Sequence, residues 1–298
     1  MYTSEINNKY LKKLDLNKNV LNTEGNIYLY PDKGYCKNYK LLKLYYDNQS
    51  IYFSNKMFTI HQLITNKEEI LKYVPNLVLP DYLVLQKSQI VGYAMDYIES
   101  VNLSEFLSNI DNKLYTKIEY LKQVGNVLEN LKLLRKYSSI DNMFLNDIHE
   151  DNFVVNKKGE LYVVDIDACK IEANIPMVGK LLTGRNTSLK NIPNKYHETT
   201  NEFGTVYTPN EQTDLYCFCI MILNFLYGKR EVQNMSIDEY YDYLSYLENL
   251  GISKDLLNVF QNLYTPFENV NPKDLLESIK DIYPKSHKNV YNVRKKRI

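Results

Sequence analysis

The spacing of apolar residues changes once along the chain, and this change limits the folds that the chain can adopt. Up to about residue 97, segments such as NIYLYP, NYKLLKLYY, LVLPDYLVLQ and QIVGYAMDYI alternate or run apolar, and turn sequences such as PDKG and DNQS separate them. From Val101 onward, apolar residues recur every three or four positions, most regularly in LYTKIEYLKQVGNVLENLKLLRKY. Strands gathered in one part of a chain and helices in the other are typical of an α+β fold.

Each part contains one exception to its pattern. In the strand-rich part, SNKMFTIHQLITNKEEILKYV places Met57, Ile60, Leu63 and Ile64 on one helical face, which predicts a helix. In the helix-rich part, FVVN and LYVVD flank the turn NKKG and predict two short strands. A strongly apolar helix is expected at 214–227, followed by amphipathic helices in IDEYYDYLSYLENL, SKDLLNVFQNLY and PKDLLESIKDIY.

Composition and charge exclude several classes of protein. Of the 298 residues, 44% are hydrophobic and 24% are charged, and the 36 Lys and Arg balance the 36 Asp and Glu. This balance fits an ordinary globular protein and offers no charged field for nucleic acid or a membrane surface. The longest apolar run, CFCIMILNFLYG, is too short to span a bilayer, and the N-terminus lacks the apolar core of a secretory signal.

The cysteines indicate a reducing compartment. Cys36, Cys169, Cys217 and Cys219 lack the spacing of metal ligands. Cys217 and Cys219 fall inside an apolar run, which predicts buried free thiols. We therefore expect a cytoplasmic protein.

Polar side chains bracket the two predicted short strands. Asp147 and Asn152 precede the first strand, and Asp165 follows the second, thirteen residues after Asn152. Because two antiparallel strands joined by a tight turn return to their starting level, these three side chains are expected around one small volume. Carboxylate and amide oxygens suit Mg²⁺ or Mn²⁺. Taken singly, the same residues could be turn formers or strand caps.

This arrangement resembles the protein kinase superfamily, and most nearly the atypical bacterial Ser/Thr protein kinases, in its D-x4-N and D-I-D motifs. The resemblance implies that Asp147 accepts the proton of the substrate hydroxyl, while Asn152 and Asp165 hold the metal bound to ATP. QTDLYCFCIMILNFLYG is similar to the buried helix whose leading acid, here Asp214, bonds to the backbone of the catalytic loop. NYKLLKLYY resembles the third strand, whose lysine, here Lys43, contacts the α and β phosphates.

The resemblance covers about residues 19–283 and implies a bilobal fold. The expected domains are an N-terminal extension (1–18), a small β-rich lobe with one main helix (19–97), a larger helical lobe (98–284) and a basic tail (285–298).

GYAMDYIESVNLSEFL resembles the strand and hinge that bind adenine. Met95 would guard the back of the nucleotide pocket, and the backbone around Asp96 and Ile98 would bond the adenine edge. Gly25, in NTEGNIY, is the one glycine at the position of the glycine-rich loop.

The sequence also departs from the kinase pattern. LND stands where HRD is usual, Ile166 and Asp167 replace Phe-Gly, and His149 replaces the loop lysine. Asp167 could be a second metal ligand or a hydrogen-bonded loop acid, and His149 is more typical of a structural or solvated loop residue. A single glycine leaves fewer positions where the backbone can approach phosphate closely.

The small-lobe helix lacks the acid that normally pairs with the strand lysine, since no Glu lies between Ser50 and Asn66. Gln62 stands at about the expected distance, and Glu68 or Glu69 could serve if the helix is longer. Lys40 is the alternative phosphate-binding lysine, and Glu202 is the candidate for the acid that ends the activation segment.

Three functions remain open at this level. The first is an ATP- and Mg²⁺-dependent protein Ser/Thr kinase, with a nucleotide and a protein as its partners. The second is a small-molecule kinase like the aminoglycoside and choline kinases, and the third is a pseudokinase that acts as a scaffold. No nucleic acid partner and no membrane span are expected. The D-x-D motif alone would also suit a nucleotide-sugar transferase, but the run of βα units typical of that class is missing.

Overall fold

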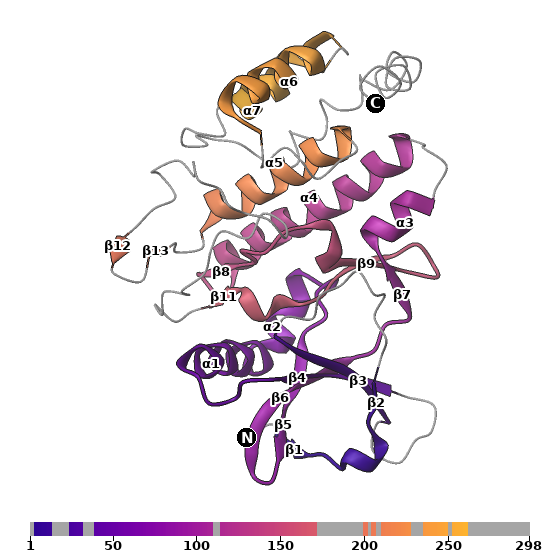
Figure 1. Ribbon diagram of the computed structural model, residues 1–298, viewed down its shortest axis with the longest axis vertical. Coiled ribbons are helices and arrows are strands. Elements are labelled where there is room, and N and C mark those ends of the chain that lie inside the picture. Colours follow the sequence, from indigo (N-terminus) through magenta and orange to yellow (C-terminus); the bar gives the residue numbers. More distant parts are fainter. Residues whose placement is uncertain are drawn as a thin grey trace.

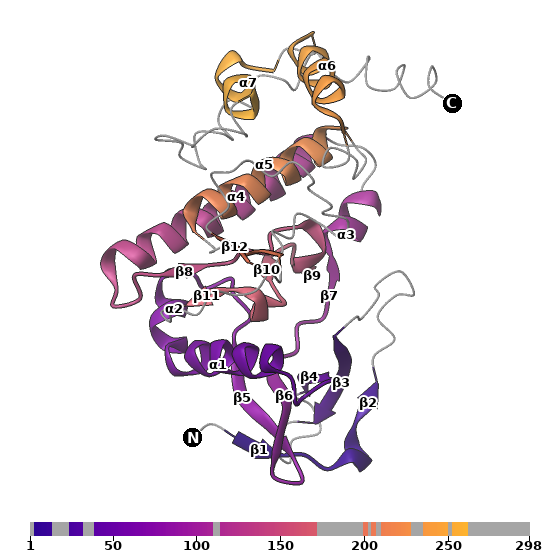
Figure 2. The same ribbon diagram turned by 60° about the vertical axis from the view of Figure 1, so that its left-hand side comes forward.

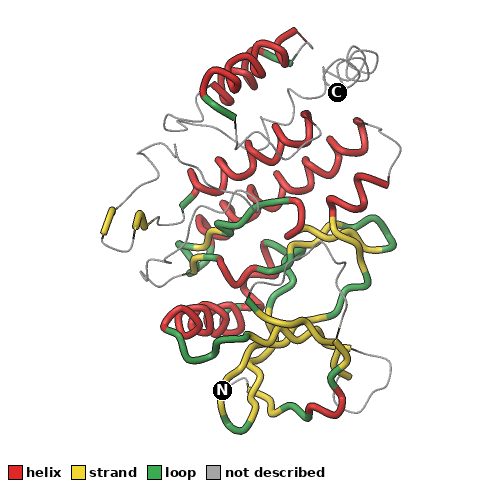
Figure 3. The backbone as a smooth tube through the Cα atoms, viewed as in Figure 1, coloured by secondary structure: helices red, strands yellow, loops and turns green. Residues whose placement is uncertain are grey.

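The computed structural model describes residues 3–13, 24–31, 39–109, 114–171, 199–201, 204–206, 210–227, 235–249 and 252–261. Strands dominate up to residue 96 and helices from residue 103 onward, as Figure 3 shows by colour. The predicted α+β class is confirmed. The helix predicted in PKDLLESIKDIY, the basic tail, Cys36 and Glu202 lie outside the described residues.

A six-stranded sheet forms the first part, with the strand order β1-β5-β6-β4-β3-β2 (Figure 1). Its strands are β1 (Thr3–Glu5), β2 (Lys12–Lys13), β3 (Gly25–Pro31), β4 (Tyr39–Tyr45), β5 (Pro80–Gln86) and β6 (Gln89–Asp96), with a short 3-10 helix, η1 (Asn8–Tyr10), between the first two. Neighbouring strands are antiparallel except β1 and β5. The four longer strands are those predicted from the sequence.

The first thirteen residues contribute to this sheet, although the sequence sets them apart as an N-terminal extension. β1 pairs with β5 and β2 pairs with β3, so each adds an edge to the sheet. With three and two residues, β1 and β2 are too short to show an alternating pattern.

The helix predicted beside the sheet is observed as α1 (Ile51–Thr65) and α2 (Lys67–Tyr73), which meet at Asn66. Ser50 caps α1, because its side chain accepts a hydrogen bond from the amide of Phe53. The four apolar side chains predicted to share one face of this helix are all buried. Figures 1 and 2 both place α1 next to the sheet, on the side where the helical part begins.

The second part is mainly helical. Its helices are α3 (Leu103–Asn109), α4 (Leu114–Tyr137), α5 (Glu211–Tyr227), α6 (Ile237–Asn249) and α7 (Lys254–Gln261). In both views α4 and α5 lie side by side (Figures 1 and 2). None of the helices within the described ranges is both long enough and apolar enough to cross a membrane.

Short strands and two 3-10 turns lie between the sheet and the long helices. They are β7 (Ser100–Asn102), β8 (Met143–Phe144), η2 (Glu150–Asn152), β9 (Phe153–Asn156), β10 (Leu161–Val163), η3 (Ile166–Ala168), β11 (Lys170–Ile171), β12 (Thr199–Asn201) and β13 (Gly204–Val206). They pair as β10-β9-β7, β11-β8 and β12-β13. The predicted hairpin around NKKG is the antiparallel pair β9 and β10.

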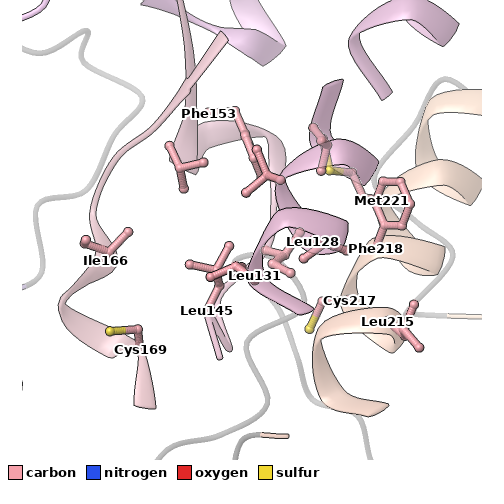
Figure 4. Packing of buried hydrophobic residues seen from close by; sticks show 14 of the residues in the cluster. Leu128, Leu131, Leu145, Phe153, Ile166, Cys169, Leu215, Cys217, Phe218 and Met221 are labelled. Carbon is pink, nitrogen blue, oxygen red and sulfur yellow. The ribbon is translucent and has the colours of Figure 1, made fainter. Parts of the chain in front are cut away.

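Apolar packing holds the second part together. Leu131 from α4 and Phe218 from α5 belong to one cluster of buried side chains, part of which Figure 4 shows. Cys169, Cys217 and Cys219 lie in the same cluster as free thiols, which confirms the prediction for Cys217 and Cys219. The buried surface of α5 explains why its sequence is apolar almost throughout.

Two glycines bring neighbouring strands close to the C-terminal end of β4. Gly25 on β3 lies opposite Tyr45, and a Cβ atom there would overlap the carbonyl oxygen of Leu44. Gly92 on β6 lies opposite Leu44 from the other side, and a Cβ atom there would overlap the carbonyl oxygen of Lys43. The backbone of β4 at Lys43 is therefore held on both sides by strands that need a residue without a side chain.

Gly92→Ala should destabilise the protein, because the added methyl group can be accommodated only if β6 moves away from β4. Overpacking of this kind typically costs about 1–3 kcal/mol. Chemical denaturation would measure the loss. Gln89→Ala, at an exposed position of the same strand, serves as the control and should change stability by less than about 0.5 kcal/mol. Equal midpoints for the two variants would contradict the close approach.

Candidate functional site

Asp147 and Asn152 lie side by side in the loop between β8 and β9. The side-chain amide of Asn152 donates to the carbonyl oxygen of Asp147 at 2.9 Å and to its carboxylate Oδ2 at 3.0 Å. The other carboxylate oxygen, Oδ1, is buried and accepts no hydrogen bond from the described residues. The two residues predicted to work together are thus in direct contact.

The hairpin brings Asp165 back to the level of Asn152, as the sequence predicts. Phe153 pairs with Val163, and the amide of Val164 then donates to the carbonyl of Asn152 at 2.9 Å. Asp165 follows directly. Asn152 and Asp165 therefore lie at the same end of the hairpin, at its base.

Two backbone positions at this site have left-handed dihedral angles. Asn146, just before Asp147, has φ of 65°, and Asp165 has φ of 56°. Asn and Asp tolerate this region better than other residues with a side chain, but it is sparsely populated. Such positions gather where a site needs a particular side-chain direction.

Asp214, at the start of α5, anchors the loop that carries Asp147. Its two carboxylate oxygens accept from the amides of Asn146 at 2.7 Å and Leu145 at 3.0 Å. Burial raises the pKa of Asp214 to about 6, although these two hydrogen bonds act in the opposite direction. The contact between the leading acid of this helix and the loop backbone, expected from the sequence, is therefore present.

Lys43 is buried on β4, and its ammonium group pairs with acids from the base of the hairpin. Its Nζ lies 2.6 Å from Asp165 Oδ1, 2.7 Å from Asp167 Oδ2 and 3.7 Å from Glu24 Oε2. Burial opposes the charge, but Asp165 and Asp167 outweigh it and hold the pKa of Lys43 well above its ordinary value. Lys43 thus remains an ammonium group inside the protein.

The partner of Lys43, which the sequence left open among three residues, is none of those three. In the part of the chain that the structure describes, Gln62 on α1 and Glu68 and Glu69 on α2 form no ion pair or hydrogen bond with Lys43. Its acids come instead from the hairpin base and from the start of β3. The alternative lysine, Lys40, pairs with Asp81 and with Asp96, both at 2.6 Å, at the other end of β4.

A second lysine, Lys56 on α1, completes this cluster and was not predicted. Its side chain is 3% exposed, and its Nζ lies 2.6 Å from Glu24 Oε2 and 3.2 Å from Asp167 Oδ1. One signal in the sequence could have identified it. Lys56 lies three residues after Phe53 and one before Met57, inside the apolar stripe of the helix, so a buried position follows from the helical period.

Asp167 is the most enclosed acid of the cluster. Besides the two lysines, the Tyr45 hydroxyl donates to its Oδ2. Burial would raise the pKa of Asp167, but Lys43, Lys56 and the Tyr45 hydrogen bond outweigh burial and keep it below the usual range. Of the two roles left open for Asp167, the described contacts are those of a hydrogen-bonded loop acid.

His149 has a structural contact and also lies near Asp147. Its Nδ1 accepts from the amide of Asp151 at 3.3 Å, which caps η2. Its Nε2 lies 3.5 Å from Asp147 Oδ1. Burial lowers the pKa of His149, but the carboxylate of Asp147 outweighs burial and raises it. The histidine therefore caps η2, and its ring lies beside the carboxylate of Asp147.

The residues predicted to bind the adenine end lie along β6 and just beyond it. Met95 on β6 is buried and pairs with Leu41 on β4. Lys43 lies two residues further along β4 and pairs with Tyr93, so Met95 and Lys43 are near each other in the sheet. Ile98 packs against the core, and its carbonyl accepts from Ser100 Oγ at 3.0 Å.

Two of the predicted nucleotide contacts have structural roles in this chain. Asp96 is exposed, and its side chain pairs with Lys40. A contact of its backbone with adenine stays a prediction. Gly25 serves the packing of β3 on β4 described above, and its contact with a nucleotide stays a prediction.

The donor set at the hairpin base fits a hard divalent cation. Asp165 presents a carboxylate that is 46% exposed, and Asn152 bonds Asp147 through its amide nitrogen, so its amide oxygen can face a cation. Clusters of three or more His, Cys, Asp or Glu side chains with metal-site geometry do not occur among the described residues. A metal here would therefore depend on Asn152 and on oxygens of its ligand as well as on Asp165.

Asp214→Asn should destabilise the loop, because one of the two backbone amides would face an NH₂ group instead of an oxygen. A buried donor left without an acceptor costs about 1–3 kcal/mol, measurable by chemical denaturation. Glu211→Gln on the same helix is the matched control, since its contacts with Lys132 and Arg135 are 3.8 and 3.9 Å long and partly exposed. A loss no larger than that of the control would mean that Asp214 does not hold the loop.

Comparisons with known proteins do not assign the chain to a family. No protein-family model matches it, and no curated protein matches its sequence.

Proposed function

We propose that the protein is an ATP-dependent phosphotransferase with a bilobal, protein kinase-like fold, and that its acceptor is a Ser or Thr hydroxyl of a protein. The contact of Lys43 with Asp165 carries this proposal. It joins a buried sheet lysine to the acid at the hairpin base, 122 residues further along the chain, at 2.6 Å. A lysine that binds phosphates must lie beside the acid that binds their metal.

The order of the strands supports the same fold. From one edge of the sheet, β2, β3 and β4 are joined by hairpin-type antiparallel pairing, and β6 then lies between β4 and β5. The helix α1 follows β4 in the chain, and β6 leads through residues 97–99 into the helical part. This is the sequence of elements expected for a small kinase lobe and its hinge.

The chain's own residues divide the work of the transfer. The acceptor hydroxyl oxygen attacks the γ phosphorus, the bond from this phosphorus to the bridging oxygen of ADP breaks, and the carboxylate of Asp147 takes the hydroxyl proton. Asn152 and Asp165 would hold Mg²⁺, which neutralises phosphate charge when bound. Lys43 binds the α and β phosphates, and the backbone around Asp96 and Ile98 binds adenine.

A pseudokinase scaffold is the second candidate, and Gly25 favours it. This glycine is needed for the packing of β3 on β4, so the chain near it has no further glycine that would let the backbone approach phosphate. The clustered acids and lysines favour chemistry, because a scaffold has no need of buried charges. A small-molecule kinase is the third candidate, and it would transfer labelled phosphate from ATP to a small molecule instead of to a protein.

Binding of a nucleotide separates the enzyme from the scaffold. ATP with Mg²⁺ or Mn²⁺ should raise the melting temperature, because a ligand that binds only the folded state stabilises by mass action, about 2.7 kcal/mol at 100 times its Kd. Differential scanning fluorimetry with and without metal measures the shift. Identical melting curves at millimolar nucleotide with either metal would remove the enzyme proposal.

The two acids of the site should fail in different ways. Asp165→Asn should weaken metal-dependent nucleotide binding about tenfold or more, because it removes the charged metal ligand. Asp147→Asn should leave binding nearly intact and lower phosphoryl transfer, since proton acceptance contributes about 10²–10⁴-fold.

Calorimetry gives the affinity and transfer of labelled phosphate gives the rate. Asp141→Asn, at an exposed position before the loop, is the control and should match the wild type in both assays. If Asp147→Asn and Asp165→Asn lose affinity and rate together, the division of roles is mistaken.

A further inference from the structure

The helix beside the sheet presents a cation to the site where a kinase would normally present an acid. An active kinase holds its strand lysine by an ion pair with a Glu on this helix. In this chain the buried, charged residue of α1 that reaches the cluster is Lys56. Two ammonium groups at one site repel each other, and a carboxylate between them offsets this repulsion.

Asp167 is that carboxylate. Its two oxygens are divided between the lysines, with Oδ2 2.7 Å from Lys43 Nζ and Oδ1 3.2 Å from Lys56 Nζ. Its side chain is 3% exposed, against 46% for Asp165. Asp165 can therefore turn to a cation from solvent, whereas Asp167 is enclosed by its partners.

The surroundings of the bridge suit two cations. The Tyr45 ring lies 5.4 Å from Lys43 Nζ and 5.7 Å from Lys56 Nζ, within the range of cation–π attraction. Glu24 supplies a third, more exposed carboxylate, which contacts both lysines. The ammonium groups of Lys43 and Lys56 are thus enclosed by carboxylates and an aromatic ring.

We propose that Asp167 is the positioning residue for Lys43, and that Lys56 transmits the position of α1 to it, as a Lys43–Asp167–Lys56 bridge. In kinases the strand lysine usually pairs directly with an acid on the helix. In this chain the helix carries a lysine instead, and the carboxylate of Asp167 lies between the two lysines. This inference rests on the proposed function in one respect, that Lys43 binds the phosphates of a nucleotide. The acid at position 167 then explains why the motif reads D-I-D instead of ending in glycine.

Relocation of the charge tests the bridge. Lys56→Glu alone places a new carboxylate beside Asp167 and Glu24, and Asp167→Gly alone leaves the two lysines with only the more exposed Glu24 as a shared acid. Each should therefore weaken nucleotide affinity at least tenfold. The double variant Lys56→Glu/Asp167→Gly restores a helix acid opposite Lys43 and should recover to within about threefold of the wild type, where one factor of ten is 1.4 kcal/mol. If the double variant loses nucleotide affinity by a factor equal to the product of the two single-variant factors, the proposal is overturned.

A chemical readout on the protein without nucleotide keeps the test open if a charge-reversed variant fails to fold. Acylation of Lys43 by an amine-reactive reagent, quantified by peptide mass spectrometry, reports how firmly its ammonium group is held. The milder variants Asp167→Asn and Lys56→Met should raise this reactivity at least threefold. Lys67→Met is the control and should leave the reactivity of Lys43 unchanged. Lys67 lies on α2, and its described ion pair is with Asp81 on β5, not with Asp167.

The two assays separate the inference from the proposed function. A wild type that binds no nucleotide defeats the proposed function, while the Lys43 reactivities of the milder variants still decide whether the bridge positions the lysine. A wild type that binds nucleotide, with Asp167→Asn equal to it in affinity and in Lys43 reactivity, defeats the bridge alone.

Discussion

The buried charges around Lys43 join three segments that are distant in the chain. β4 supplies Lys43, α1 supplies Lys56, and the turn after β10 supplies Asp165 and Asp167. Transfer of an ion from water into a protein costs on the order of several kcal/mol unless partners compensate for it. The sheet, α1 and the hairpin are therefore held in one relative position by charge pairing as well as by apolar packing. A shift of any one of them would leave a buried charge without its partner.

Rigid backbone features hold this charge cluster in place. Gly25 and Gly92 let both neighbouring strands approach β4 at the residues around Lys43. On the other side, the side chain of Asp214 fixes the loop before Asp147, because its carboxylate accepts hydrogen bonds from two backbone amides of that loop. The loop and the strand of Lys43 are thus each fixed by contacts that do not involve the charges around Lys43. Such separation lets the site residues keep strained or charged arrangements that would be unstable on a mobile segment.

Local signals in the sequence predicted the structure correctly. The helical period identified α4 at its observed bounds, and the alternating pattern identified the four longer strands. Asp165 was predicted at the level of Asn152, because antiparallel pairing follows from two short strands and a tight turn. The sequence did not predict β1 and β2, whose few residues have no period, or the partner of Lys43. That partner was sought on the helix by analogy, whereas the buried carboxylate comes from the hairpin.

The sequence by itself determined the α+β class, the longer elements, and the spacing that joins Asp147, Asn152 and Asp165, because periodicity and hairpin geometry act over a few residues. Only the tertiary structure decided which charges meet. Lys56 and Asp167 are separated by 111 residues, and nothing in the local pattern of either one names the other. Their pairing depends on how α1 packs against the sheet and the hairpin base, since burial is what makes each charge require the other.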